Sequence, residues 1–223
     1  MASVEEELWE EMVRPLLMGQ SAPALTKGPQ MQLAGALQSW VARSIGDRLG
    51  AMLPAADVTG HALEHFTPKS KGRSFLGGMR WQEVDVWIAA DDFGLALAAD
   101  PKHFQSQDSL KKNWKNGHND LVAFATNLHE RFPMCAIAGI IAFPAHAAAD
   151  TQLRQMERIC ERSIPRERPL NAYGKFEAFA IVRYSDVGAL DFPFGASSEL
   201  SAERAFSRLA EIVFSRFVAT YAT

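Results

Sequence analysis

Cysteine is scarce in this chain, with only Cys135 and Cys160 among 223 residues. The two lie far apart and form no CxxC spacing, so we expect neither a disulfide framework nor a thiolate zinc site. The N-terminus lacks the basic and then apolar character of a signal peptide, because residues 4–11 are mainly acidic. The longest apolar run, residues 134–144, has about half the length of a membrane helix. These absences predict a cytoplasmic protein without a membrane segment.

The chain also lacks a strong excess of either charge, since 23 Lys and Arg residues are set against 26 Asp and Glu residues, a formal net charge of -3. With 48% hydrophobic and 22% charged residues, the composition is that of a globular protein with one core. We therefore predict a single domain over residues 1–223. A nucleic-acid surface would have to be a local patch. The candidate strip contains Lys69, Lys71, Arg73, Arg80, Lys102, Lys111, Lys112 and Lys115. A solvated lysine face is the commoner meaning of such a run.

Several nucleotide-binding and hydrolase motifs are missing. The sequence contains no GxxxxGK[ST] loop for nucleotide phosphates, no GxGxxG after a strand and no GxSxG elbow. Gly77-Gly78 is better explained as a bend at the entry to a strand than as a phosphate cradle. We therefore expect no nucleotide cofactor.

Hydrophobic spacing indicates a helical N-terminal part, residues 1–66, followed by an α/β core, residues 73–223. The expected helices are 4–18, 31–52, a short one before Pro68, 110–132, 150–163 and 201–221. The expected strands are two short alternating segments around 83–88 and 95–102, then 134–143 and 176–184. This order predicts an α/β fold with a central mixed sheet flanked by helices on both sides.

The two short alternating segments form a hairpin that carries four charged residues. If the turn is centred between positions 92 and 93, paired residues have numbers that sum to 185. Asp85 then lies opposite Asp100, Glu83 lies opposite Lys102, and all four share one face. Two facing carboxylates repel each other, so a cation or a proton is expected between them. This pair is the first indication of a metal site.

A second register is open, because Gly94 could adopt the left-handed conformation of a G1 bulge. The pairing sum would then be 186, and Asp85 would face Pro101. A slip of one residue that is not corrected turns the acids of one strand away from those of the other. The metal site therefore depends on the register of this hairpin.

Asp85 followed by Asp100-Pro101-Lys102, on a hairpin that leads into a helix and a buried strand, resembles the PD-(D/E)xK nuclease superfamily, the fold of many restriction endonucleases. The resemblance covers roughly residues 57–185. Val84 stands where the family's proline precedes the first acid. Pro101 lies inside the triplet, where proline suits a strand end because it lacks an amide donor.

The resemblance implies a restriction-endonuclease-like fold and Mg²⁺-dependent hydrolysis of DNA phosphodiester bonds, in restriction or another defence role, with Mn²⁺ able to substitute. Asp85, Asp100 and the carbonyl of Pro101 would ligate the metal. Lys102 would orient the attacking water and stabilise developing negative charge. The family's helix glutamate would be Glu64.

Further contacts are expected around this site. Gln105, just past the second strand, is a candidate for contact with water or phosphate. The DNA-binding candidates are Lys71, Arg73, Lys111, Lys112 and Lys115, with Trp114 either in the core or at the DNA. Trp81 and Trp87 are expected to be structural, and Trp87 shares the face of Asp85. Cleavage of two strands calls for two active sites, so a homodimer is compatible with this activity.

Two alternatives stay open. One is a non-catalytic nucleic-acid-binding or scaffold protein in which the four charges form only cross-strand ion pairs. The other is a zinc peptidase, because His61-Ala62-Leu63-Glu64-His65 resembles the HxxEH motif of inverzincins. On a helix, His61 and His65 would lie one turn apart on the same face, as zinc ligation requires.

Overall fold

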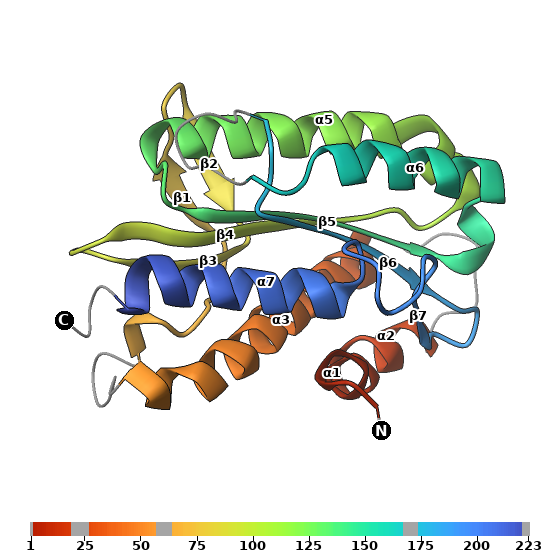
Figure 1. Cartoon of the computed structure of the whole chain (residues 1–223). Helices are drawn as coiled ribbons and strands as arrows, with labels where there is room; N and C mark the ends of the chain where they lie inside the picture. The colour runs from red at the N-terminus through yellow and green to blue at the C-terminus, as the bar shows by residue number, and fades with distance from the viewer. Residues whose placement is uncertain (1, 19–26, 57–63, 167–173, 220–223) are drawn as a thin grey trace.

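A computed structural model describes residues 2–18, 27–56, 64–166 and 174–219 (Figure 1). Its centre is a mixed five-stranded sheet with helices on both faces. The strands, in spatial order, are β3 (Val86–Ala90), β4 (Gly94–His103), β5 (Ala136–Pro144), β6 (Ala178–Tyr184) and β7 (Leu190–Asp191). One face is covered by α5 (Gln107–Arg131) and α6 (Asp150–Arg162), and the other by α3 (Lys27–Met52) and α7 (Ala202–Val213). The predicted α/β architecture is confirmed.

Strand β5 is the centre of the core. All nine of its residues are buried, and it runs parallel to both β4 and β6. Alternate residues of β5 belong to the two hydrophobic clusters, with Ile140 packed on the α3 and α7 side and Ile141 on the α5 side. A strand buried on both faces needs apolar residues at every position, which explains the unbroken apolar run in the sequence.

The N-terminal helices pack on the same face of the sheet as α7. The predicted helix 4–18 is split at Val13 into α1 (Val4–Met12) and α2 (Arg14–Met18), and the predicted helix 31–52 begins four residues earlier as α3. Trp9 of α1 and Trp40 of α3 are fully buried, with ring centroids 5.1 Å apart in an edge-on arrangement. Both belong to the hydrophobic cluster that contains residues of the sheet, so the helical part and the sheet share one core.

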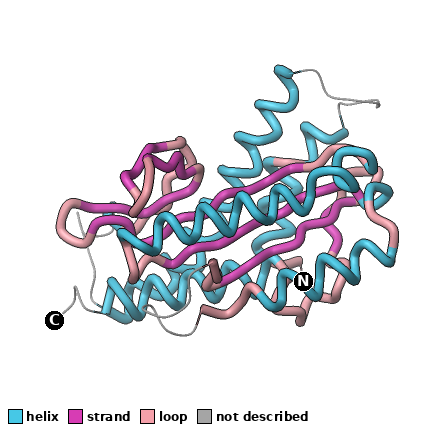
Figure 2. Tube along the Cα trace, turned by 90° about the horizontal axis from the view of Figure 1, so that it is seen from above, coloured by secondary structure: helices cyan, strands magenta, loops and turns pink. Residues whose placement is uncertain are grey.

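A second, two-stranded sheet is formed by β1 (Arg73–Leu76) and β2 (Trp81–Val84), and it is set apart from the main sheet (Figure 2). Glu83 belongs to this sheet, where its partner is Ser74. The prediction that Glu83 lies opposite Lys102 is therefore wrong. The physical reason is a bend at Asp85, which separates β2 from β3 and ends the pairing with β4.

The remaining elements are short. They are the 3-10 turns η1 (Leu53–Ala56) and η2 (Ala145–Ala147), and a π-helical turn, η3 (Phe214–Val218), that continues α7. In the part of the chain that the structure describes, no helix is both long and apolar enough to cross a bilayer.

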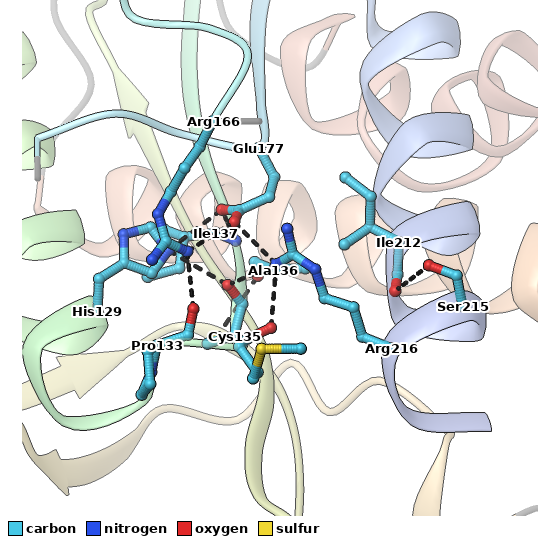
Figure 3. Close-up of polar contacts among 11 residues, drawn as sticks. His129, Pro133, Cys135, Ala136, Ile137, Arg166, Glu177, Ile212, Ser215 and Arg216 are labelled. Carbon is cyan, nitrogen blue, oxygen red and sulfur yellow. Dashed lines mark hydrogen bonds and ion pairs between the residues drawn. The ribbon is translucent and has the colours of Figure 1, made fainter. Parts of the chain in front are cut away.

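A buried carboxylate ties the beginnings of β5 and β6 to the ends of two helices (Figure 3). Glu177 Oε1 accepts hydrogen bonds from Arg166 Nη1 and Arg216 Nη1, both at 2.9 Å. Its Oε2 accepts from the Ile137 backbone N–H at 3.0 Å and lies 3.2 Å from His129 Nε2. Burial alone would raise the pKa of Glu177, but the hydrogen bonds and nearby positive charge outweigh it and the pKa is lowered. Glu177 is thus a charged group inside the core.

Removing this carboxylate should strongly destabilise the protein. Glu177→Ala leaves two largely buried guanidinium groups without a counter-charge, and we expect a loss of about 3–5 kcal/mol in the free energy of unfolding, measured by urea denaturation. Glu177→Gln, which keeps the size but not the charge, should lose less. The exposed Glu161→Ala is the matched control and should change stability by less than about 0.5 kcal/mol.

The same carboxylate gives a pH dependence of known sign. The pKa of Glu177 is lower in the folded protein than its ordinary value of 4.5. The ionised carboxylate therefore makes its full contribution to the free energy of unfolding above pH 4.5, and this contribution is lost as the pH falls through the folded-state pKa. The stability difference between the parent protein and Glu177→Ala should therefore shrink in acid. A difference that grew in acid would contradict the assignment of a buried, ionised Glu177.

Candidate active site

The register of the β3–β4 hairpin decides where its acidic residues point. Near the turn the pairing sum is 184, because residues 91–93 form a three-residue turn and Gly94 adopts a φ of 72°. From the pair Ile88 and Leu97 onward the sum is 185, and Ala96 is left unpaired as a bulge. The turn is therefore centred on position 92 and not between positions 92 and 93. Gly94 is left-handed, as the second register supposed, but the pairing sum beside it is 184 and not 186. The bulge nevertheless restores the expected register in the part of the hairpin that leads to Asp85 and Asp100.

The structure brings Asp85 and Asp100 together, next to the last β3–β4 pair, Val86 with Ala99. Asp100 is 7% exposed, and its Oδ2 accepts from Lys102 Nζ at 2.8 Å. Its Oδ1 is buried, and no donor of the described residues reaches it. The Asp85 carboxyl can hydrogen-bond to Asp100 only when one of the two carries a proton. The site therefore has two acids and one close positive charge.

This arrangement raises the pKa of both acids. Burial, followed by the repulsion of Asp100, raises the pKa of Asp85 from 3.8 to about 6. Burial also raises the pKa of Asp100, although the charge of Lys102 and its hydrogen bond act in the opposite direction. Asp120 on α5 adds a further repulsion on Asp100. A cation that approached both carboxylates would relieve this penalty.

Helix α3 supplies a residue that the sequence analysis missed. Gln38 lies beside Asp85, and its side-chain amide lowers the pKa of that carboxyl, partly offsetting the effect of burial. Gln38 lies on α3 between the buried positions Leu37 and Val41. Nothing in that spacing indicates which face of the helix meets the hairpin, so this contact could not be predicted from the sequence.

Trp87 lies two residues after Asp85 and packs against the segment that leads into β1 and against β1 itself. Its indole Nε1 donates to the Lys71 carbonyl at 2.9 Å, and its ring packs edge-on against Phe75 with centroids 5.7 Å apart. Its backbone pairs with that of Lys69 through two hydrogen bonds on the outer edge of β3. Trp87 is therefore structural, as expected, and it links the segment before β1 to the site.

The other predicted site residues lie outside this group of contacts. Glu64 is exposed on a short helical turn, and no hydrogen bond or ion pair of the described residues joins it to either aspartate. Gln105 is half-buried, and its Oε1 accepts from Gln30 Nε2 of α3 at 3.4 Å. Pro101 follows Asp100 in β4, inside the sheet and paired with Ile140 of β5.

The predicted DNA-binding residues are all exposed. Lys111, Lys112 and Lys115 lie on the first half of α5, where Lys112 forms a long 3.9 Å ion pair with Asp108. Trp114 is 2% exposed, so it belongs to the core. Lys71 and Arg73 lie on the other side of Asp85, next to β1 and on it.

The carboxylate oxygens of Asp85 and Asp100 suit a hard cation, although only two side chains supply them. No group of three or more His, Cys, Asp or Glu side chains able to hold a metal occurs in the described ranges. Asp85 and Asp100 supply carboxylate oxygens, which Mg²⁺ prefers, and Mg²⁺ commonly binds one or two carboxylates while keeping several waters. The buried Asp100 Oδ1, which meets no donor, is the atom that fits such an ion best. The predicted zinc site of the HxxEH segment stays a prediction, because one of its two histidines, His61, lies outside the described residues.

The two carboxylates should reduce stability at neutral pH. Asp85→Asn removes one charge, and after allowance for solvent screening we expect a gain of about 1 kcal/mol in the free energy of unfolding at pH 7.5. Because the pKa of Asp85 is raised to about 6, the folded protein retains its proton to a higher pH than the unfolded chain does. The gain should therefore be absent below pH 4 and complete above pH 6.

Thermal unfolding of both proteins between pH 4 and 8 would measure this difference. Asp47 is exposed and forms no hydrogen bond or ion pair with the described residues, so Asp47→Asn is the matched control and should follow the parent protein at every pH. A lower Tm for Asp85→Asn at pH 7.5 would mean that the carboxylate stabilises the fold and that the proposed repulsion is wrong.

Comparison with known proteins adds no relative. The chain matches no protein-family model, and neither the curated proteins nor the solved structures that were searched contain a significant match. The functional interpretation therefore rests on the geometry of Asp85, Asp100 and Lys102.

Proposed function

We propose that the protein is a Mg²⁺-dependent endonuclease that hydrolyses DNA phosphodiester bonds through Asp85, Asp100 and Lys102. The observation that carries this proposal is the bulge at Ala96, because it restores the register in which both carboxylates and the lysine converge. Strongly perturbed, mutually repelling acids are typical of functional sites. A hairpin with a merely structural role would gain nothing from burying Asp100 beside Asp85.

Each residue has a distinct part in this proposal. Asp85 and Asp100, with the Pro101 carbonyl, would hold the Mg²⁺ ion, which when bound supplies Lewis-acid polarisation of the phosphate and a more acidic water. Lys102 keeps its ammonium group 2.8 Å from Asp100, where it can orient a water and stabilise developing negative charge on the phosphate. Gln38 would favour the ionised form of Asp85 that a metal ion needs, because its side-chain amide lowers the pKa of that carboxyl.

The topology supports a restriction-endonuclease-like assignment of the fold. The acidic hairpin of β3 and β4 leads through α5 into the buried parallel strand β5, which is the order expected from the resemblance. Gln38 also lies on a helix that precedes the hairpin, the kind of element from which that family supplies a glutamate. A cytoplasmic defence or restriction role, and a homodimer that cuts both strands, belong to the same proposal.

Substitution of the site should abolish cleavage while the fold persists. Asp100→Ala and Lys102→Ala should each lower Mg²⁺-dependent cleavage of plasmid DNA by at least about 100-fold, because each removes a group that acts on the reacting phosphate or water. Circular dichroism should show an unchanged fold. Asp186→Ala and Lys175→Ala, both exposed, are the matched controls and should cleave at the parent rate. Undiminished cleavage by either site variant would refute the assignment.

Metal binding separates this proposal from a scaffold role. Calorimetry should detect Mn²⁺ or Mg²⁺ binding to the parent protein, with affinity reduced at least about 10-fold in Asp85→Asn because one of two carboxylate ligands is lost. Since protons compete for the same oxygens, binding should weaken as the pH falls below 6. A protein that bound neither metal at pH 7.5 would be a binding or scaffold protein in which Lys102 neutralises Asp100 permanently.

A further inference from the structure

The β1–β2 hairpin carries an exposed apolar patch made of Leu76, Met79 and Trp81. Their exposed fractions are 46%, 68% and 68%, and Leu76 and Trp81 are direct partners across the two strands. The expectation that Trp81 has a structural role is therefore wrong, because its side chain is largely exposed. A large aromatic ring in water is costly, and adjacent exposed apolar side chains commonly mark a binding surface.

The patch is held in a fixed position by helix α5. Asn127, which is fully buried, accepts at its Oδ1 from the backbone N–H groups of Met79 (2.9 Å) and Arg80 (3.2 Å), and its Nδ2 donates to the Arg80 carbonyl at 3.1 Å. The Asn127 carbonyl accepts from the Gly78 N–H at 2.8 Å. Four hydrogen bonds thus fasten the hairpin turn to the helix. The apolar side chains are presented on a rigid base, which reduces the entropy lost on binding.

The same close approach requires a glycine at position 77, whereas at position 78 the exposed Glu130 side chain could move aside. A Cβ at Gly77 would lie 2.4 Å from the Asn127 side chain, and a Cβ at Gly78 would lie 2.4 Å from the Glu130 side chain. Gly77 therefore lets the hairpin sit directly on α5. This is a packing role and not the phosphate cradle that a glycine pair can suggest.

The hairpin and the segment before it carry mainly positive charge. Between residues 66 and 82 the charged side chains are Lys69, Lys71, Arg73 and Arg80, although the whole chain has a net charge of -3. Two acidic side chains also lie close, Glu83 of β2 beside Gly72 and Glu130 of α5 beside Gly78. The four basic side chains are exposed, and none forms an ion pair within the described part of the chain. The Arg73 guanidinium instead lies over the rings of Phe75 and Trp87, 5.2 and 5.1 Å from their centroids. A surface of this charge fits a polyanion.

We infer that this hairpin binds an unpaired nucleotide of the DNA substrate, with the base stacked on Trp81 and the backbone phosphates beside the four cations. Single strands are recognised by this combination of a basic surface with an exposed aromatic ring. Bases inside a duplex are already stacked and offer Trp81 no free face. The substrate is therefore DNA with a single-stranded segment, such as a fork, a flap or a loop.

The position of the hairpin connects this surface to the candidate active site. Trp81 begins β2, and Asp85 follows the last residue of that strand, so at most about 13 Å separates their backbones. That distance corresponds to about four base steps of stacked DNA. The choice of DNA and this connection rest on the proposed nuclease function. The apolar patch and the unpaired cations are independent of it.

Binding assays without cleavage can test the inference. Fluorescence anisotropy in EDTA would compare a labelled single-stranded oligonucleotide with a blunt duplex of the same sequence. Trp81→Ala should weaken single-strand binding about 10-fold and leave duplex binding nearly unchanged, whereas Trp81→Phe should retain most of the affinity. Val187→Ala removes exposed apolar surface elsewhere and is the matched control. Intrinsic fluorescence should be quenched by the single strand, and less so in Trp81→Phe.

The outcomes separate this inference from the proposed function. If Trp81-dependent binding is found but no variant cleaves DNA with Mg²⁺, the nuclease proposal fails and the binding surface stands. If the parent protein cleaves DNA but Trp81→Ala binds single strands as the parent does, the inference is overturned. Binding to anionic phosphatidylserine vesicles that depends on Trp81, without binding to the oligonucleotide, would also overturn it and assign the patch to a lipid surface.

Discussion

The buried carboxylate of Glu177 connects β5 and β6 to α5 and to the segments that follow α6 and α7, at one end of the sheet. It lies just before β6, accepts from the Ile137 backbone N–H of β5, and receives Arg166 from the segment after α6 and Arg216 from the turn that continues α7. Arg166 and Arg216 also donate to carbonyls in the loop between α5 and β5. Parallel strands cannot be set in register by tight turns, so a shared polar anchor at their beginnings does this task here.

The contrast between this anchor and the candidate site is electrostatic. Glu177 has two guanidinium groups and a histidine around a single carboxylate, and its pKa is lowered despite full burial. Asp85 and Asp100 have one ammonium group between them, and their pKa values are raised. The same chain thus compensates a buried charge completely in one place and incompletely in another. Incomplete compensation persists in folded proteins mainly where the residues have a task other than stability.

The features that the sequence predicted are those governed by local periodicity. The apolar run of β5 has the composition of a doubly buried strand, and the arithmetic of a hairpin was sufficient to place Asp85 near Asp100. The contribution of Gln38 was not predictable, because it depends on how a helix crosses a sheet. The exposure of Trp81 was not predictable either. The sequence around a strand residue that follows a turn does not indicate which side of the small sheet is left uncovered.

Residue Glu83 shows a different limit. Alternation of apolar and polar residues continues from β2 through Asp85 into β3, so the sequence pattern reads as one strand. The bend that divides it into two sheets leaves the periodicity intact and changes only the partners, from β1 before the bend to β4 after it. Register arithmetic is therefore valid only as far as the strand remains in one sheet.

The bulge at Ala96 also separates the tip of the β3–β4 hairpin from the half that leads to Asp85 and Asp100. The eight residues between Ile88 and Leu97 can be accommodated by a three-residue turn with a bulge or by a two-residue turn without one, and both leave the pairs beyond them unchanged. The tip is thus free to diverge in sequence and in turn type during evolution, and it offers a place for labels or grafted loops. An insertion or deletion between Leu97 and Asp100 has no such compensation and would move one carboxylate to the opposite face of the sheet.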